Sequence, residues 1–190
     1  MANTGNIGAG KPAVAGGIYA CLTSNIKEDA PLPTDATTDM STLTHFKSLG
    51  YISEDGVTNE NSPETEDTKS WDGATVSSIQ TSKEDTFSWK MLEVLNEDVL
   101  KLLYGSANVT TTGGATTIEA TTDEMEAYAY VIDMIIGEKA QRIVIPNAKV
   151  NEVSEMTYSG SEVVGYEITV TAMPDPARED KTVTHYTYIK

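Results

Sequence analysis

Alternating hydrophobic and polar side chains predict strands in the second half of the chain. Phe87, Trp89 and Met91 alternate with polar neighbours, which is the period of a strand with one buried face. In the stretch 164–172, apolar side chains recur at every second position and give the same period. These two segments therefore predict half-buried strands.

Further strands are predicted from apolar runs and the turns between them. The runs 128–136 and 142–145 flank Gly137-Glu138, which is typical of a hairpin. Residues 18–22 predict the first strand and 182–189 the last one. The Thr- and Gly-rich segment 110–117 between these groups is interpreted as a linker.

One helix is predicted after the strand that contains Met91. Asn96 is a favourable N-cap, Glu97 and Asp98 stand in the first turn where the helix dipole favours anions, and Gly105 is a typical stop. The apolar positions between them form one stripe, so the helix is expected to pack on a sheet. The residues expected to pack are Val99, Leu100, Leu102 and Leu103.

The predicted fold class is mainly β: an antiparallel β-sandwich or partial barrel with one flanking α-helix. The composition agrees, because Thr, which favours strands, occurs 26 times and Tyr outnumbers Phe by 9 to 2. A chain of 190 residues has room for one ordinary domain. We expect a single β-sandwich domain over 18–190, preceded by a flexible glycine-rich arm over 1–17.

The segment 54–72 carries seven acidic side chains against one base, Lys69, and it includes Trp71. Without an apolar period, this segment is predicted to be a long acidic loop. Loops of more than about 12 to 15 residues are usually functional or disordered. Clustered carboxylates suit calcium, but the spacing does not fit an EF-hand, because Gly56 comes too early. A solvated loop is the favoured interpretation, with a weak, non-specific cation site left open.

The formal net charge of −16 argues against several functions. Phosphates of nucleic acids and anionic lipids would repel such a surface, so specific DNA binding and membrane binding are not expected. No apolar run approaches the roughly 20 residues that span a bilayer, and the first ten residues lack the features of a secretory signal. Cys21 is the only cysteine, so it can form neither an internal disulfide nor a thiolate zinc site.

Motifs for catalysis or cofactor binding are weak. Gly5 to Lys11 resembles a phosphate-binding loop, but Pro12 stands where that loop needs a hydroxyl, and no strand precedes it. His45 and His185 are the only imidazoles, and the sequence pairs neither with a nucleophile. We therefore predict no catalytic, cofactor-binding or metal-binding residues.

Asp133 lies inside the apolar run 128–136, where a carboxylate must be paired or must face water. It is a possible lumen-facing acid, if that strand turns a polar face to an aqueous channel. An ordinary solvent-facing strand position is the favoured interpretation, because side chains alternate along a strand.

Several separate segments occur in the order found in one protein family. Together they resemble the major tail tube protein of long, non-contractile-tailed, siphovirus-type bacteriophages, and the resemblance covers roughly residues 48–175. The segments that carry it are Gly50–Val57 (GYISEDGV), Lys69–Gly73 (KSWDG), Thr86-Phe87, Leu103–Gly105 (LYG), Ile143–Ala148 (IVIPNA) and Gly165–Ala172 (GYEITVTA).

The resemblance implies a non-catalytic structural protein of the virion tail, made in the bacterial host cytoplasm. It implies a tail-tube-type β-sandwich whose copies close into hexameric rings. Stacked rings would form a hollow tube that surrounds the tape-measure protein, ends at a tail terminator, and conducts DNA without binding it specifically. In relatives, the N-terminal arm and the long loop contact neighbouring subunits. The implied loop residues here are Glu54, Asp55, Gly56, Glu64, Glu66, Asp67 and Trp71.

Two other classes of function remain open from the sequence. The chain could be a non-catalytic β-sandwich binding or decoration module of a virion or cell surface, with Trp71 as the aromatic side chain that contacts a ligand. A hydrolase ranks lowest, because no acid–base pair stands out.

Overall fold

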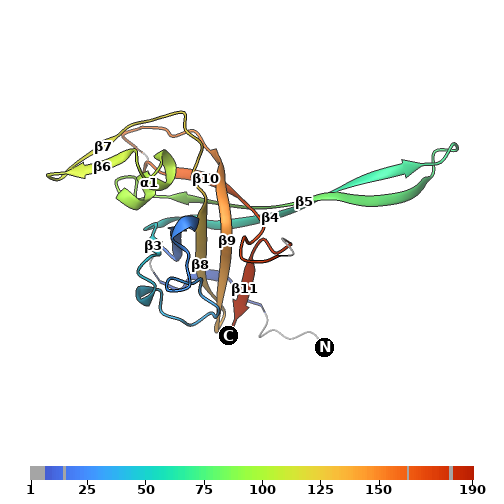
Figure 1. The fold of residues 1–190 in the computed structure, drawn as a ribbon, viewed down its shortest axis with the longest axis horizontal. Coiled ribbons are helices and arrows are strands. Elements are labelled where there is room, and N and C mark those ends of the chain that lie inside the picture. Colours follow the sequence, from blue (N-terminus) through green and yellow to red (C-terminus); the bar gives the residue numbers. More distant parts are fainter. Residues whose placement is uncertain (1–6, 15, 162, 180–181) are drawn as a thin grey trace.

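Antiparallel strands form most of the structure, which is a computed structural model that describes residues 7–14, 16–161, 163–179 and 182–190 (Figure 1). Nine strands make one sheet, in which the path β3-β2-β8-β9-β10-β5-β4 is extended by β1 beside β8 and by β11 beside β9. These strands are β1 (Gly10–Pro12), β2 (Ile18–Leu22), β3 (Lys47–Ser48), β4 (Ile52–Lys69), β5 (Thr75–Met91), β8 (Tyr128–Ile136), β9 (Lys139–Val153), β10 (Tyr166–Ala172) and β11 (Tyr186–Ile189).

The sheet curls over a hydrophobic core, so that its two ends face each other. Trp89 of β5 meets Tyr130 of β8 edge to face with 5.4 Å between ring centroids, although β9 and β10 separate these strands in the sheet. Phe87, Ile168 and Val170 are almost fully buried in the same core. The sheet is not closed into a barrel, because β4 ends the strand path and pairs with β5 alone.

A second, smaller cluster covers the outer face of the same sheet. Met40 and Phe46, from the segment between β2 and β3, pack against Cys21, Val131 and Val144. As a result, β8 is buried on both faces over most of its length, with the burial pattern of an interior strand.

The single α-helix of the described residues, α1 (Glu97–Tyr104), has the ends that the sequence predicts. The Asn96 side chain accepts a hydrogen bond of 3.0 Å from the Asp98 backbone N–H, and Gly105 ends the helix with a φ of 93°. All four predicted packing residues are buried, at 0 to 7% exposure: Val99, Leu100, Leu102 and Leu103.

The fold-class prediction is therefore confirmed: the chain is mainly antiparallel β with one α-helix that packs on the core. The predicted hairpin across Gly137-Glu138 is present as β8 and β9. The alternation 164–172 is β10, whose even-numbered residues are buried.

Two predicted irregular segments are strands instead. The linker 110–117 is a hairpin of β6 (Val109–Thr112) and β7 (Ala115–Ile118), turned by Gly113-Gly114. The predicted flexible arm contains β1, whose three residues pair with Met134–Ile136 of β8. Backbone pairing needs no large side chains, which explains why a glycine-rich segment can join the sheet. The arm's residues 1–6 and 15 lie outside the described residues.

Candidate assembly surface

The β4–β5 hairpin is the most prominent feature of the molecule, since it projects from one side of the body (Figure 1). Near the body, the buried residues of β5 alternate with partly exposed ones from Asp85 to Met91. From Asn61, which pairs with Asp85, to the turn, both strands have lost that buried face. We call residues 61–84 the outer ribbon.

The outer ribbon is continuously paired and lies almost entirely in water. Its register runs from Ser62 opposite Glu84 to Lys69 opposite Thr75, with bulges between Glu64 and Thr65 and near Lys69. About nine strand residues at roughly 3.3 Å each give a projection of about 30 Å. Isolated two-stranded hairpins are at best marginally stable in water. This ribbon is therefore expected to gain stability from a partner surface.

The turn presents a fully exposed indole. Ser70 N–H donates to the Ala74 carbonyl at 2.8 Å, and Gly73 N–H donates to the Ser70 carbonyl at 2.9 Å. The Ser70 hydroxyl and the Ala74 N–H also donate to the Asp72 carboxylate, which holds the pKa of that carboxyl below its usual value. Trp71 makes no ring contact in the described structure and is completely exposed, at 107% of its reference area.

A buried carboxylate anchors the ribbon to the body at its base. Asp85 is 2% exposed and accepts hydrogen bonds from the Asn61 amide and, at 2.5 Å, from the Thr184 hydroxyl. His185 Nδ1 lies 3.6 Å from the same carboxylate. Burial by itself would raise the pKa of Asp85, but the two hydrogen bonds and the nearby imidazole outweigh it and lower the pKa. The ribbon thus leaves the body at a point fixed to the residues just before β11.

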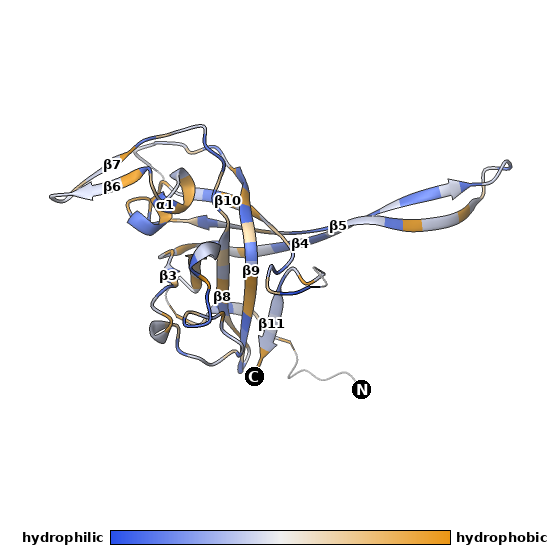
Figure 2. Cartoon of the chain, viewed as in Figure 1, coloured by the Kyte–Doolittle hydropathy of each residue, from blue (hydrophilic) through white to orange (hydrophobic). Residues whose placement is uncertain are grey.

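The side chains of the ribbon are mostly polar. It carries five acidic and two basic side chains, and in Figure 2 it is mostly blue and pale, with orange segments on β5. Val76 and Ile79 of β5 are each 63% exposed. No cluster of three or more metal-ligating side chains occurs among the residues that the structure describes.

All seven predicted assembly residues lie on the β4–β5 hairpin, but the prediction of a long loop is wrong. Glu54, Asp55 and Gly56 lie on β4 next to the body, and the others follow along the outer ribbon to its turn: Glu64, Glu66, Asp67 and Trp71. The stretch lacks an apolar period because neither face is buried. The signal that sequence reasoning missed is Asp72-Gly73, a typical hairpin dipeptide, followed by strand-favouring Thr, Val and Ile.

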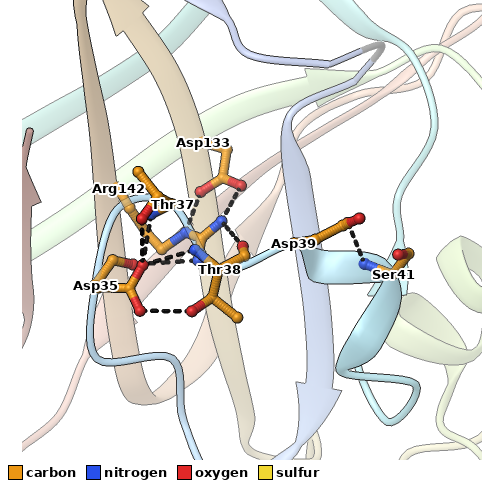
Figure 3. A network of polar contacts seen from close by, with 7 residues as sticks. All are labelled: Asp35, Thr37, Thr38, Asp39, Ser41, Asp133 and Arg142. Atoms are coloured by element: carbon orange, nitrogen blue, oxygen red, sulfur yellow. Dashed lines mark hydrogen bonds and ion pairs between the residues drawn. The ribbon is translucent and has the colours of Figure 1, made fainter.

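Asp133 does not face water, so both sequence interpretations of this residue are wrong. It is 8% exposed and paired with Arg142, whose Nε and Nη2 donate to the two carboxylate oxygens at 2.5 and 2.6 Å. Arg142 also donates to the Asp35 carbonyl at 3.1 Å and to the Thr38 carbonyl at 2.9 Å (Figure 3). The ion pair therefore holds the segment that covers the outer face of the sheet.

The Asp35 side chain supports this network from the other side. Its carboxylate accepts hydrogen bonds from the hydroxyl and backbone N–H of Thr38 and from the backbone N–H of Thr37 (Figure 3). These hydrogen bonds hold the pKa of Asp35 well below its usual value. The turn that offers its carbonyls to Arg142 is thus held in one conformation.

The geometry defines a mainly antiparallel β protein with a solvated ribbon that projects from its body. The chain belongs to the phage tail tube proteins: residues 12–187 match the family described as "Phage tail tube protein". It is accordingly a structural, non-enzymatic component of the virion tail. None of the helices in the described part has the length and apolar character needed to cross a membrane.

Two solved structures are similar in fold at low sequence identity. One is titled "Virion of native gene transfer agent (GTA) particle" (9% identity, 67% of this chain and 84% of that chain covered, TM-score 0.39). The other is titled "Cryo-EM structure of the anti-feeding prophage cap (AFP tube terminating cap)" (10% identity, 100% and 99% covered, TM-score 0.41). No curated protein matches the chain significantly.

Proposed function

We propose that this chain is a tail tube subunit that closes into hexameric rings and that the outer ribbon links copies of the chain as the rings stack. The observation that carries the proposal is the ribbon itself, whose strands pair only with each other from Ser62–Glu84 to Lys69–Thr75 and have no buried face. A free β-hairpin of this length exposes unpaired edges that invite association, and an assembly of identical copies would cover them.

The charge of the chain supports passage of DNA through the tube. Six chains of −16 would carry −96 formal charges per ring. DNA carries one negative charge per ~1.7 Å of its axis, so an anionic bore would repel it rather than hold it. Salt screens this repulsion beyond a Debye length of about 8 Å, so it acts near the wall. The tape-measure protein and a tail terminator are the further partners that this function implies.

Shortening the hairpin tests the role of the ribbon. Ser62 and Glu84 are paired, so an Asn-Gly turn can join them and replace residues 63–83 without changing the Asn61–Asp85 anchor. We expect a folded protein that keeps the near-ultraviolet circular dichroism of its buried aromatic side chains, Trp89 among them, and forms no stacked tubes in negative-stain electron microscopy. Tubes of normal length from this variant would refute the assembly role.

A binding or decoration module is the second candidate, and the complete exposure of Trp71 favours it. The same microscopy separates the two functions. Wild-type protein that stays monomeric at high concentration, without rings or tubes, would favour the binding module. Rings or tubes of wild-type protein would favour the tail tube subunit.

A further inference from the structure

A groove lies where the two ends of the curled sheet approach each other without pairing. It has a volume of about 280 Å³ and is lined by β1, β2 and β8 on one side and by the start of β4 on the other. Ile18, Ile52, Val57 and Met134 supply apolar side chains to it, and glycine backbone forms much of the remaining wall. Nothing in the described part of the chain fills this space.

The groove and the tip of the outer ribbon are complementary. Trp71 offers a large apolar surface with no contact of its own, and the groove offers apolar walls and open glycine backbone. The charged groups that line the groove are Lys11, which is exposed, and Asp133, which Arg142 neutralises. Lys11 is thus the one charge of the lining that is not neutralised within it, and it can meet the ribbon, which carries a net charge of −3.

A chain cannot fill its own groove with its own tip. Val57 lines the groove, and the twelve residues of extended strand from there to Lys69 span roughly 40 Å at about 3.3 Å per residue, with Trp71 in the turn beyond. The hairpin also points away from the body (Figure 1). A Trp71 side chain that enters this groove must therefore come from a second molecule.

We infer that the Trp71 indole of one copy inserts into this groove of a neighbouring copy. The inference rests on the proposed function and specifies the contact that the ribbon makes. Tip and groove are different surfaces, so each copy gives one contact and receives another. Such a heterologous contact can propagate from copy to copy, as a tube requires, whereas a two-fold contact closes at a dimer.

Tryptophan fluorescence tests this contact directly. The chain has two tryptophans, and Trp89 is already buried at 2% exposure, so a change in emission on assembly reports Trp71. We expect the emission of wild-type protein to move to shorter wavelength when tubes form. The Trp71→Phe variant, which keeps an aromatic ring, is expected to lose this shift. Tubes in which Trp71 keeps the emission of a water-exposed indole would overturn the inference.

A second variant fills the groove. Gly10 lines it, and a Cβ there would meet only the Met134 sulfur at 3.9 Å and Ile136 Cγ1 at 4.0 Å, which is ordinary contact. Gly160→Leu is the matched control, because Gly160 has no neighbour within 4 Å and lies outside the groove. We expect Gly10→Leu to raise the concentration needed for assembly roughly tenfold or more and Gly160→Leu to leave it unchanged.

The outcomes separate this inference from the proposed function. If the shortened hairpin abolishes tubes while Gly10→Leu assembles like Gly160→Leu, the ribbon links the copies but the groove is not its site. If the shortened hairpin still forms normal tubes, the proposed function fails first. Melting temperatures of both glycine variants, expected to match the wild type within a few degrees, show that a loss of tubes is not a loss of folding.

Discussion

Removal of the Arg142 guanidinium is expected to destabilise the fold more than any change on the ribbon. Arg142→Met keeps the apolar stem but leaves the Asp133 carboxylate buried without its partner, and it leaves the Asp35 and Thr38 carbonyls without their donor. Breaking a buried ion pair in this way costs about 3–5 kcal/mol. In a chain of this size each kcal/mol shifts the melting temperature by about 2–4 °C, so a decrease of roughly 10 °C is expected.

The double variant Arg142→Met/Asp133→Leu separates the ion pair from mere packing. Because no unpaired charge remains, we expect it to recover most of the lost stability, as replacements of buried ion pairs by apolar groups often do. Urea unfolding followed by circular dichroism, on protein too dilute to assemble, measures both variants. A single variant within about 1 kcal/mol of the wild type, or a double variant as unstable as the sum of its singles, would refute this account.

Three further predictions concern the helix and the base of the ribbon. Leu103→Asp puts an unpaired carboxylate at a position that is 7% exposed and should cost several kcal/mol, so an unchanged melting temperature would contradict the packing of α1. Asn96→Ala removes the N-cap and should cost about 1 kcal/mol in urea unfolding, whereas Asn96→Asp should cost much less. The pKa of Asp85 is lowered in the folded chain, so its charge stabilises the fold above the pKa of the unfolded state, and this contribution is lost as the pH falls through the lower, folded value. The free energy of unfolding of Asp85→Asn should therefore fall less steeply than that of the wild type as the pH is lowered below about 5. An unchanged pH dependence of the free energy of unfolding would rule out this stabilising role of the Asp85 charge.

The sequence predicts the strands and the helix that bury only one of their faces. Phe87 and Trp89 alternate with polar residues because one face of inner β5 packs on the core, and the apolar stripe of α1 has the same cause. In such elements the hydrophobic period records the geometry directly. The turn at Gly137 adds the pairing of β8 with β9.

Strands whose two faces are both solvated or both buried are not predicted from the hydrophobic period. The reasons in the two cases are opposite. The outer ribbon is solvent-exposed on both faces, so its mostly polar sequence has no hydrophobic period. Only the Asp72-Gly73 turn indicates a hairpin. Strand β8 is buried on both faces, because the segment around Met40 and Phe46 covers its outer side. No local rule in the β8 sequence indicates that this segment covers the strand, which is why the sequence alone predicts a water-facing Asp133.

The partner of Asp133 could nevertheless have been found from the sequence. A hairpin turned at Gly137-Glu138 places Ile136 opposite Lys139, and counting outward places Asp133 opposite Arg142. Directly opposed residues of antiparallel strands share a face, so the carboxylate and the guanidinium must lie side by side. A carboxylate in an apolar strand is either paired or exposed to water, and Asp133 is paired.

The composition of the ribbon fits a surface that must stay soluble before it binds. A long, flat, apolar edge strand would associate with any other edge, whereas acidic side chains and bulges along β4 discourage such pairing. In the assembly proposed above, specific association depends on a contact at one end of the ribbon, where Trp71 is exposed. An acidic stem with a single aromatic tip keeps free copies apart by charge repulsion and still allows a defined contact once a tip reaches a groove. In the proposed assembly, this division lets a negatively charged ribbon of a strongly acidic chain also be the element that joins its copies.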